Sequence, residues 1–177
     1  MMMKKGFGDK WCDWVMRTVR GGKVAIKTND RVGPYFTTHK GVRQGDPFSP
    51  LLFNIVVDGL ACMVQRAKDE GVISGLIPHI IPNGCCCLQY ADDTIFLLKD
   101  DLEGARNLKF ILCLFEQMSG LKINFHKSEI FCLGEAVDKE FWYADIFTCP
   151  SNCLPMKYLG VPIDDKKLCK SLWLPTV

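Results

Sequence analysis

Two adjacent aspartates, Asp92 and Asp93, interrupt an otherwise apolar stretch, and this interruption constrains the fold more than any other feature of the chain. The runs on either side, residues 85–90 and 94–98, have the composition of short strands. A two-stranded hairpin with both acids at its tip keeps them out of the apolar layer. Because like charges repel, and apolar surroundings strengthen that repulsion, the pair needs water or a cation beside it. Carboxylate oxygens suit Mg²⁺, and a solvated turn is the alternative.

A second motif, residues 41–50, places two glycines and two prolines before a long apolar stripe. Arg43 carries a planar guanidinium that suits phosphate, and Gln44 carries an amide that can both donate and accept hydrogen bonds. Gly45 allows a nucleotide to approach the backbone closely. These residue types predict a nucleotide-binding loop. An ordinary loop followed by a helix N-cap at Ser49 is the alternative.

The spacing of apolar residues predicts an α+β fold, with helices packed on a small antiparallel sheet. Helical spacing predicts helices at about 11–20, 49–69, 101–119 and 136–147. Strands are expected at 24–27, 35–38, 85–90, 94–98, 129–133 and 157–163. The chain of 177 residues is long enough for one domain with its own core.

Charge is unevenly divided along the chain. Residues 1–45 carry ten Lys and Arg against three Asp and Glu, whereas the remainder carries twelve against seventeen. A basic front part suits a polyanion, and an acidic remainder suits cations. The alternative is a solvated surface with uneven charge.

The ten cysteines and the polar start of the chain predict an intracellular protein, nuclear or cytoplasmic and not secreted. The cysteine spacing lacks the two close pairs that a zinc site needs, so the thiols are expected to act as small buried hydrophobes. No membrane partner is expected, because Asn54 and Asp58 interrupt the apolar run 51–64.

Five segments then match one family in order. They are 6–11 (GFGDKW), 41–50 (GVRQGDPFSP), 90–93 (YADD), 120–128 (GLKINFHKS) and 158–162 (YLGVP). With these segments the chain resembles the reverse transcriptase domain of non-LTR (LINE-type) retrotransposons, particularly plant ones. RNA-directed RNA polymerases usually have glycine where Ala91 stands. Intron-encoded maturases are a closer alternative, but the segments 6–11 and 158–162 look more LINE-like.

The resemblance implies a polymerase palm and an RNA-directed DNA polymerase, a nucleotidyltransferase with Mg²⁺ or Mn²⁺ as cofactor. Asp92 and Asp93 would be catalytic metal ligands. Lys127 would lie near the leaving pyrophosphate as a general acid, with a solvated lysine as the alternative. The reaction would be in-line attack of a primer 3′-hydroxyl on the α-phosphorus of a deoxynucleoside triphosphate, with two metal ions stabilising the attacking and leaving oxygens.

The resemblance also implies binding residues. Those bordering the nucleotide and the RNA template would be Arg43, Gln44, Gly45 and Tyr90. Those gripping the end of the DNA primer would be Tyr158, Leu159 and Gly160.

The resemblance further implies a catalytic aspartate on a strand upstream of Gly6, which only five residues precede. We therefore expect residues 1–177 to form a partial domain without fingers and with little thumb. It would have a basic front part at 1–45 and the start of the primer-grip and thumb region at about 155–177. Such a chain would bind Mg²⁺ weakly and need upstream sequence or another chain. The alternatives are a non-catalytic nucleic-acid-binding remnant and a decayed retrotransposon fragment.

Overall fold

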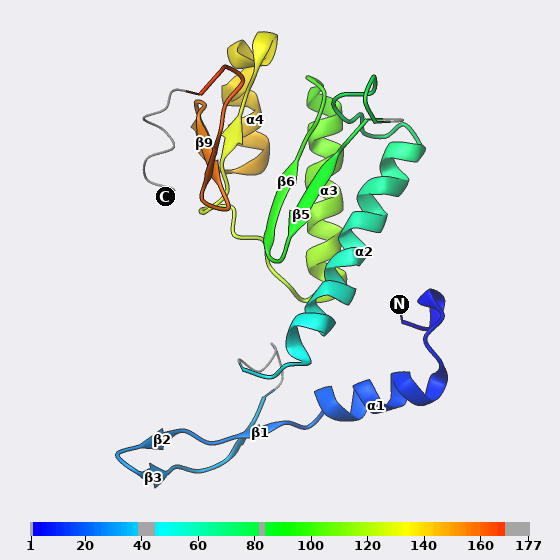
Figure 1. The fold of residues 1–177 in the computed structure, drawn as a ribbon, viewed down its shortest axis with the longest axis vertical. Helices are drawn as coiled ribbons and strands as arrows, with labels where there is room; N and C mark the ends of the chain where they lie inside the picture. Colours follow the sequence, from blue (N-terminus) through cyan, green and yellow to red (C-terminus); the bar gives the residue numbers. More distant parts are fainter. Residues whose placement is uncertain (1, 39–44, 82–83, 169–177) are drawn as a thin grey trace.

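The structure is a computed structural model that describes residues 2–38, 45–81 and 84–168 (Figure 1). The front part holds η1 (Met3–Lys5), α1 (Asp9–Val19), β1 (Lys23–Val24), β2 (Lys27–Thr28), β3 (Arg31–Val32) and β4 (Phe36–Thr37). The middle holds α2 (Ser49–Asp69), β5 (Cys87–Tyr90), β6 (Asp93–Phe96) and α3 (Leu102–Ser119). The last part holds β7 (Ile130–Phe131), η2 (Gly134–Lys139), α4 (Glu140–Phe147), β8 (Ser151–Asn152), β9 (Met156–Tyr158) and β10 (Val161–Ile163).

The fold mixes helices with small sheets, as the α+β prediction requires, but the single antiparallel sheet is wrong. The described residues form five separate two-stranded sheets. Four are antiparallel, and the pairing of β7 with β8 is parallel. The strands are only two to four residues long, at or below the short end of the usual range of about 3–10 residues.

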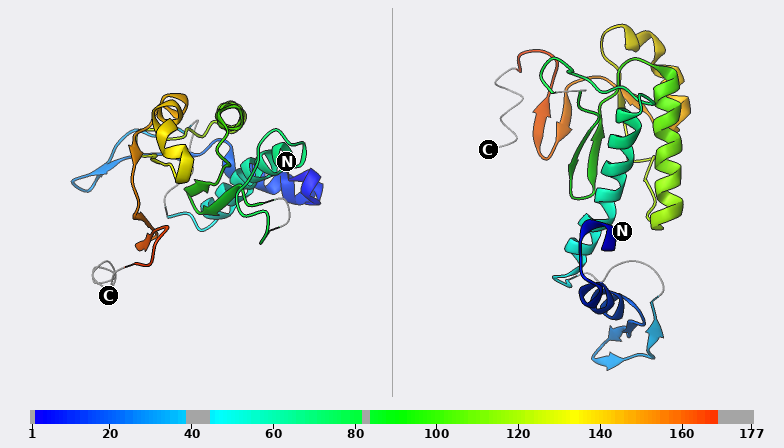
Figure 2. Two further views of the ribbon diagram at one scale, coloured as in Figure 1. Left: turned by 90° about the horizontal axis from the view of Figure 1, so that it is seen from above. Right: turned by 90° about the vertical axis from the view of Figure 1, so that its right-hand side faces the viewer.

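The core lies between α2 and α3, which run side by side along the β5–β6 hairpin (Figures 1 and 2). The two helices turn their apolar stripes toward each other, as amphipathic helices do. The buried cluster consists of Leu60, Val64, Ala67, Ile73, Cys86, Leu108, Ile111, Leu112 and Phe115. This packing fixes α2, and α2 in turn positions the site described below.

The ends of α3 follow from its capping residues. The Asp101 carboxylate accepts hydrogen bonds from the backbone N–H groups of Glu103 and Gly104, both at 3.0 Å. Gly120 ends the helix with a φ of 72° in the left-handed region. The predicted boundaries of this helix are confirmed.

The start of α2 differs from the expected one by a residue. Ser49 is the first helical residue rather than the N-cap, and it is buried. The Asp46 carboxylate instead accepts a hydrogen bond of 2.9 Å from the Phe48 N–H, and the Asp46 carbonyl accepts one from the Ser49 N–H. Asp46 therefore sets the geometry with which the chain enters α2.

A polar cluster ties α4 to the start of α3. The Asp100 carboxylate accepts hydrogen bonds from the Lys139 ammonium and the Tyr143 hydroxyl, both at 2.6 Å. Lys139 and Tyr143 hold the pKa of Asp100 below its usual range, although desolvation opposes them. On the other side, the Lys109 ammonium donates to the Phe147 carbonyl at 3.2 Å.

The front part ends in a long hairpin, residues 23–37, which we call the hairpin arm. It extends away from the helices (Figure 1). β1 pairs with β4 near its base, and β2 pairs with β3 near its tip. Asn29 and Asp30 at the tip have φ values of 48° and 61°, the combination that a tight I′-like hairpin turn needs.

By length and composition alone, α2 would suffice to cross a membrane, with a mean hydropathy of 1.2. Core helices of globular domains meet the same criterion, and Leu60 and Val64 of α2 are buried against α3. At 21 residues, α2 is also longer than the apolar run 51–64, on which the exclusion of a membrane partner was based. The exclusion of a membrane partner stays a prediction.

Candidate active site

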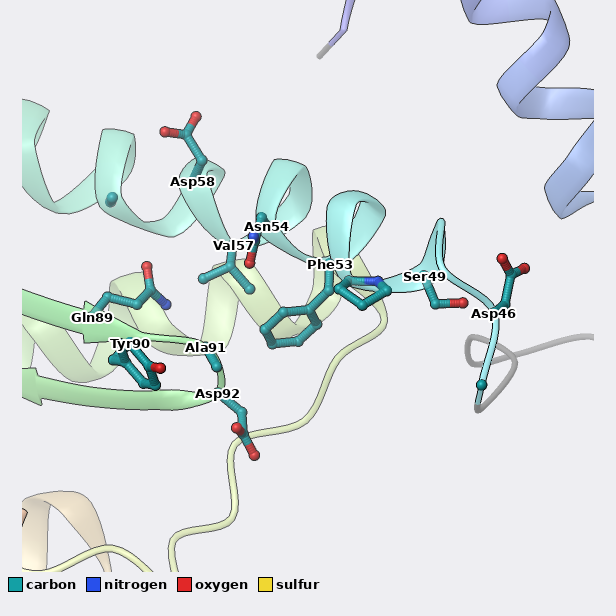
Figure 3. A pocket seen from close by; sticks show the side chains of 13 residues that line it. Asp46, Ser49, Phe53, Asn54, Val57, Asp58, Gln89, Tyr90, Ala91 and Asp92 are labelled. Carbon is teal, nitrogen blue, oxygen red and sulfur yellow. The ribbon is translucent and has the colours of Figure 1, made fainter. Parts of the chain in front are cut away.

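An open hollow of about 850 Å³ lies between the first half of α2 and the tip of the β5–β6 hairpin (Figure 3). Two motifs that are distant in the sequence meet here, because the core holds α2 beside the hairpin. The lining residues are Gly45, Asp46, Ser49, Pro50, Phe53, Asn54, Val57, Asp58, Ala61, Gln89, Tyr90, Ala91 and Asp92.

One face of α2 forms the helical wall of the hollow. Its lining residues recur every four positions, at 49, 53, 57 and 61 and at 50, 54 and 58, which is the spacing of neighbours on a helix surface. Asn54 adds an amide to this face, and Phe53 lies between the helix and the hairpin tip (Figure 3). The adjacent face of α2 carries Leu60 and Val64 into the core. One face of α2 therefore packs in the core, while the adjacent face lines the hollow.

The hairpin tip forms the opposite wall. Tyr90 pairs with Asp93 in the ladder, which leaves Ala91 and Asp92 as a two-residue loop. Ala91 has a φ of 51°, in the left-handed region that residues with a Cβ atom seldom adopt. A backbone held in this region costs roughly 1–2 kcal/mol. The turn brings Asp92 to the hollow, whereas Asp93 is not among the lining residues.

Three carboxylates line the hollow, and Figure 3 shows that they do not converge. Asp58 forms an ion pair with Lys5, and Asp46 is engaged at the start of α2. Hydrogen bonding to Asp58 raises the pKa of the Lys5 ammonium. Only Asp92, of the three, has no hydrogen bond or ion pair to another described residue. It is therefore the carboxylate best placed to accept an added cation.

The donor chemistry of the tip fits a divalent cation that a ligand helps to hold. Asp92 and its neighbour Asp93 are exposed and supply hard oxygen ligands. Mg²⁺ commonly uses one or two carboxylates together with substrate phosphates and water. Among the described residues there is no group of three His, Cys, Asp or Glu side chains that could share a metal ion. The two aspartates therefore fit a weakly held ion.

The structure brings some of the predicted site residues together. Gly45, Tyr90 and Asp92 surround the hollow, with Asp93 one residue beyond it. Arg43 and Gln44 lie outside the described residues. Gly45 has a φ of 80°, in the left-handed region that favours glycine, and the close approach of a nucleotide to its backbone stays a prediction.

Lys127 does not line the hollow. It is exposed in a turn after α3, where its backbone N–H donates to the Asn124 carbonyl at 3.0 Å. Nearby residues of this loop line a second, smaller hollow of about 460 Å³, which contains Lys109, Lys122 and His126. The role of Lys127 as a general acid stays a prediction.

The segment expected to grip the primer, residues 158–160, forms a hairpin turn that is not part of the lining of the hollow. Tyr158 pairs with Val161, and Leu159 and Gly160 between them have φ values of 49° and 84°. Two successive residues with positive φ give the turn a twist that matches a hairpin. This segment therefore has a defined shape, and its contact with a primer stays a prediction.

The sequence reading missed the contribution of α2 to the site. In the sequence, Phe53 was only part of an apolar stripe, and Asn54 and Asp58 were only interruptions of it. Asn54 and Asp58 lie four positions apart, on one face of α2. Both follow the loop motif of residues 41–50 in the sequence, so the motif did not include them. Polar residues that recur at helical spacing inside an apolar run were the signal that this face borders a hollow.

The cysteines behind the hairpin behave as apolar side chains. Burial raises the pKa of the Cys86 thiol, and it raises the pKa of the Cys87 thiol to about 11. Both thiols therefore stay protonated at neutral pH and pack in or against the core. The expectation of buried hydrophobes holds for Cys86 and Cys149, whereas Cys62, Cys113 and Cys153 are exposed.

The chain is similar to known proteins over most of its length. Residues 4–163 match the profile of the family described as "Reverse transcriptase (RNA-dependent DNA polymerase)". A Pol polyprotein from a type-1 retrotransposable element R2 of Popillia japonica is 32% identical over 122 residues, 69% of this chain and 19% of the relative. A Pol polyprotein from the type-2 element R2DM of Drosophila melanogaster is 32% identical over 123 residues, 70% of this chain and 10% of the relative.

A third relative, an uncharacterised mitochondrial protein of Arabidopsis thaliana, is 36% identical over 58 residues, 33% of this chain and 48% of the relative. The plant-like assignment stays a prediction. The chain spans less than a fifth of the length of the R2 relatives. With the match covering nearly the whole chain, the protein belongs to the reverse transcriptase (RNA-dependent DNA polymerase) family, in the non-LTR retrotransposon group.

Proposed function

We propose that the chain is a palm-like segment of an RNA-directed DNA polymerase that extends a DNA primer on an RNA template with deoxynucleoside triphosphates. The observation that carries this proposal is the placement of Asp92 at a hairpin tip, facing a hollow whose other wall begins at Gly45. Family membership supports the same activity. The R2 relatives are named as Pol polyproteins, which supports the same class of reaction.

The residues of the chain would position the reactants. Asp92 and Asp93 would hold Mg²⁺ or Mn²⁺, which when bound neutralises charge on the reacting phosphate. Gly45 lets the nucleotide approach the backbone, while Tyr90 and Phe53 offer ring surfaces on the two walls. Such positioning supplies much of the rate enhancement in phosphoryl transfer.

A two-metal reaction needs more carboxylate oxygens than this hollow offers. Asp46 and Asp58 already have partners, which leaves Asp92 and its neighbour Asp93. Two adjacent aspartates hold two cations poorly, because their own repulsion is only partly compensated. We infer that a further carboxylate, from another segment or another chain, completes the site.

The remaining assignments belong to the same proposal. Lys127 would protonate the leaving pyrophosphate, and the turn at Leu159 would grip the primer. Arg43 and Gln44 would border the nucleotide and template. Residues 1–45 would be the basic front part, and about 155–177 would begin the primer-grip and thumb region.

Primer extension on an RNA template tests the proposal. The purified chain, with Mg²⁺ or Mn²⁺, is expected to extend a primer slowly or not at all. A chimera in which the 122-residue segment of this chain that aligns with the Popillia japonica R2 polyprotein replaces its counterpart there is expected to extend the primer. Asp92→Asn in the chimera is expected to remove extension.

The outcomes separate the two parts of the proposal. Efficient, Asp92-dependent extension by the chain alone would contradict the incomplete site and leave the activity in place. A folded, RNA-binding chimera without activity, beside an active parent protein, would contradict the proposed activity.

A further inference from the structure

The hairpin arm presents basic and aromatic side chains that the catalytic proposal does not use. The side chains of Tyr35 and Phe36 are 71% and 49% exposed. The exposed Lys23 and Arg31 form no ion pair with any residue that the structure describes. The acid at the tip, Asp30, is already paired with Lys27 at 2.6 Å. The arm therefore carries uncompensated positive charge beside exposed rings.

Among the residues that the structure describes, the strands of the arm pair only with one another. The arm extends away from the end of α2 that borders the hollow (Figure 1). Arg20, exposed at the end of α1, adds a further positive charge next to its base. Fold stability does not explain these side chains, because none of the four arm residues above lies in the core.

We propose that the hairpin arm is a binding surface for single-stranded nucleic acid, separate from the catalytic hollow. Lys23 and Arg31 would contact backbone phosphates, and Tyr35 and Phe36 would stack on unpaired bases. Proteins that hold single strands combine these two elements, since every base has a face on which an aromatic ring can stack. Duplex bases are already stacked on one another, so the surface discriminates against duplexes.

Charge complementarity favours a nucleic acid over a protein partner. Interface cores between proteins are depleted of lysine and other charged residues. On the arm, residues 23–37, the basic side chains of Lys23, Lys27 and Arg31 are followed by the adjacent rings of Tyr35 and Phe36. A single-stranded nucleic acid offers negative phosphates to the basic side chains of the arm and exposed bases to its aromatic side chains.

Fluorescence anisotropy with the full chain and a labelled oligouridylate of about 12 nucleotides tests the proposal, in EDTA and without nucleotides. These conditions make the result independent of polymerisation. Tyr35→Ala/Phe36→Ala is expected to weaken binding about fivefold or more. The matched control is Phe141→Ala/Trp142→Ala, a second pair of adjacent aromatics that are 72% and 58% exposed. It is expected to change binding less than twofold.

Salt dependence tests the charged residues. Lys23→Gln/Arg31→Gln is expected to reduce the slope of log affinity against log salt by about 1.4, from about 0.7 for each contact to a single strand. Lys99→Gln/Arg106→Gln removes the same charge from exposed positions close to the start of α3, outside the proposed binding segments, and is expected to leave the slope unchanged. Because Phe36 pairs across the ladder with Val24, Tyr35→Ala alone serves as a variant that keeps the arm folded.

Three results would overturn the proposal. One is an equal loss of affinity in the arm variants and their controls. Another is binding of duplex RNA as tightly as of oligouridylate. The third is unchanged RNA affinity with loss of self-association in sedimentation velocity, which would identify the arm as a protein interface. An oligothymidylate probe distinguishes a preference for RNA from binding of either nucleic acid.

Discussion

At the scale of single residues, Asp92 depends on its neighbour Ala91 for its place at the hollow. Ala91 takes the left-handed conformation that closes a two-residue loop, and Asp92 follows it to the tip. The sequence predicted that both acids lie at a hairpin tip, because a tip between two apolar strands keeps charged side chains out of the apolar layer. It did not predict that Asp46 and Asp58 would line the same hollow with partners of their own, since those contacts depend on tertiary packing.

Asp100 gives a prediction about pH at this scale. Its pKa is lowered in the folded state by the hydrogen bonds from Lys139 and Tyr143. A lowered folded-state pKa adds stability above the unfolded-state value of about 3.9, and that stability is lost as the pH falls through the folded-state pKa. Asp100→Asn is therefore expected to be less stable than the wild type at pH 7, and the gap should close as the pH falls below about 4.

Urea unfolding between these pH values checks the prediction. Asp138→Asn removes an exposed aspartate close to Lys139 and serves as the control. A stability gap for Asp100→Asn that stayed constant down to acidic pH would show that the carboxylate charge has no part in holding α4.

At the scale of elements, the helices were predictable and the sheet was not. Local signals fix the ends of α3, namely Asp101 at its start and Gly120 at its end. The strands are too short to carry much local signal, and their pairing depends on which neighbours reach them. Periodicity therefore indicated hairpins but could not indicate five separate sheets.

The α2–α3 packing gives a prediction at this scale. Leu108 is 2% exposed within the core, whereas Leu114, on the outer face of the same helix, is 38% exposed. Leu108→Ala removes buried methyl groups and leaves a cavity, so it is expected to cost about 2–5 kcal/mol. Leu114→Ala is expected to cost about 1 kcal/mol or less.

The free energies of unfolding in urea, measured for both variants, provide the comparison. Because the two substitutions are chemically identical and on one helix, the difference reports burial alone. Equal costs would mean that α3 packs on both faces in solution.

At the scale of the whole molecule, the chain is less compact than its mass implies. It exposes 13442 Å² of surface, whereas a compact monomer of 20.0 kDa would expose about 8,700 Å². The projecting arm accounts for part of the difference (Figure 1). The length of the chain predicted one domain with its own core, but length carries no information about how compactly that domain folds.

This openness predicts a low denaturant m-value. The m-value scales with the increase in accessible surface area on unfolding. For this chain, that increase is about three-quarters of the increase for a compact protein of the same mass. Urea unfolding followed by circular dichroism is expected to give an m-value about three-quarters of that of compact proteins of the same length. A value typical of those proteins would show that the chain closes further in solution.

The five small sheets also bear on the order in which the chain acquires its structure. Three of those in the described residues join consecutive strands through a short loop, and the β1–β4 pair extends the hairpin that β2 and β3 begin. Contacts between sequence neighbours form quickly, and they do not wait for the rest of the polypeptide. During synthesis the hairpin arm can form before α2 has left the ribosome, and the β5–β6 hairpin before α3 arrives to cover it. The hairpin arm and the hairpin that carries Asp92 can therefore each fold before the next helix along the chain is complete.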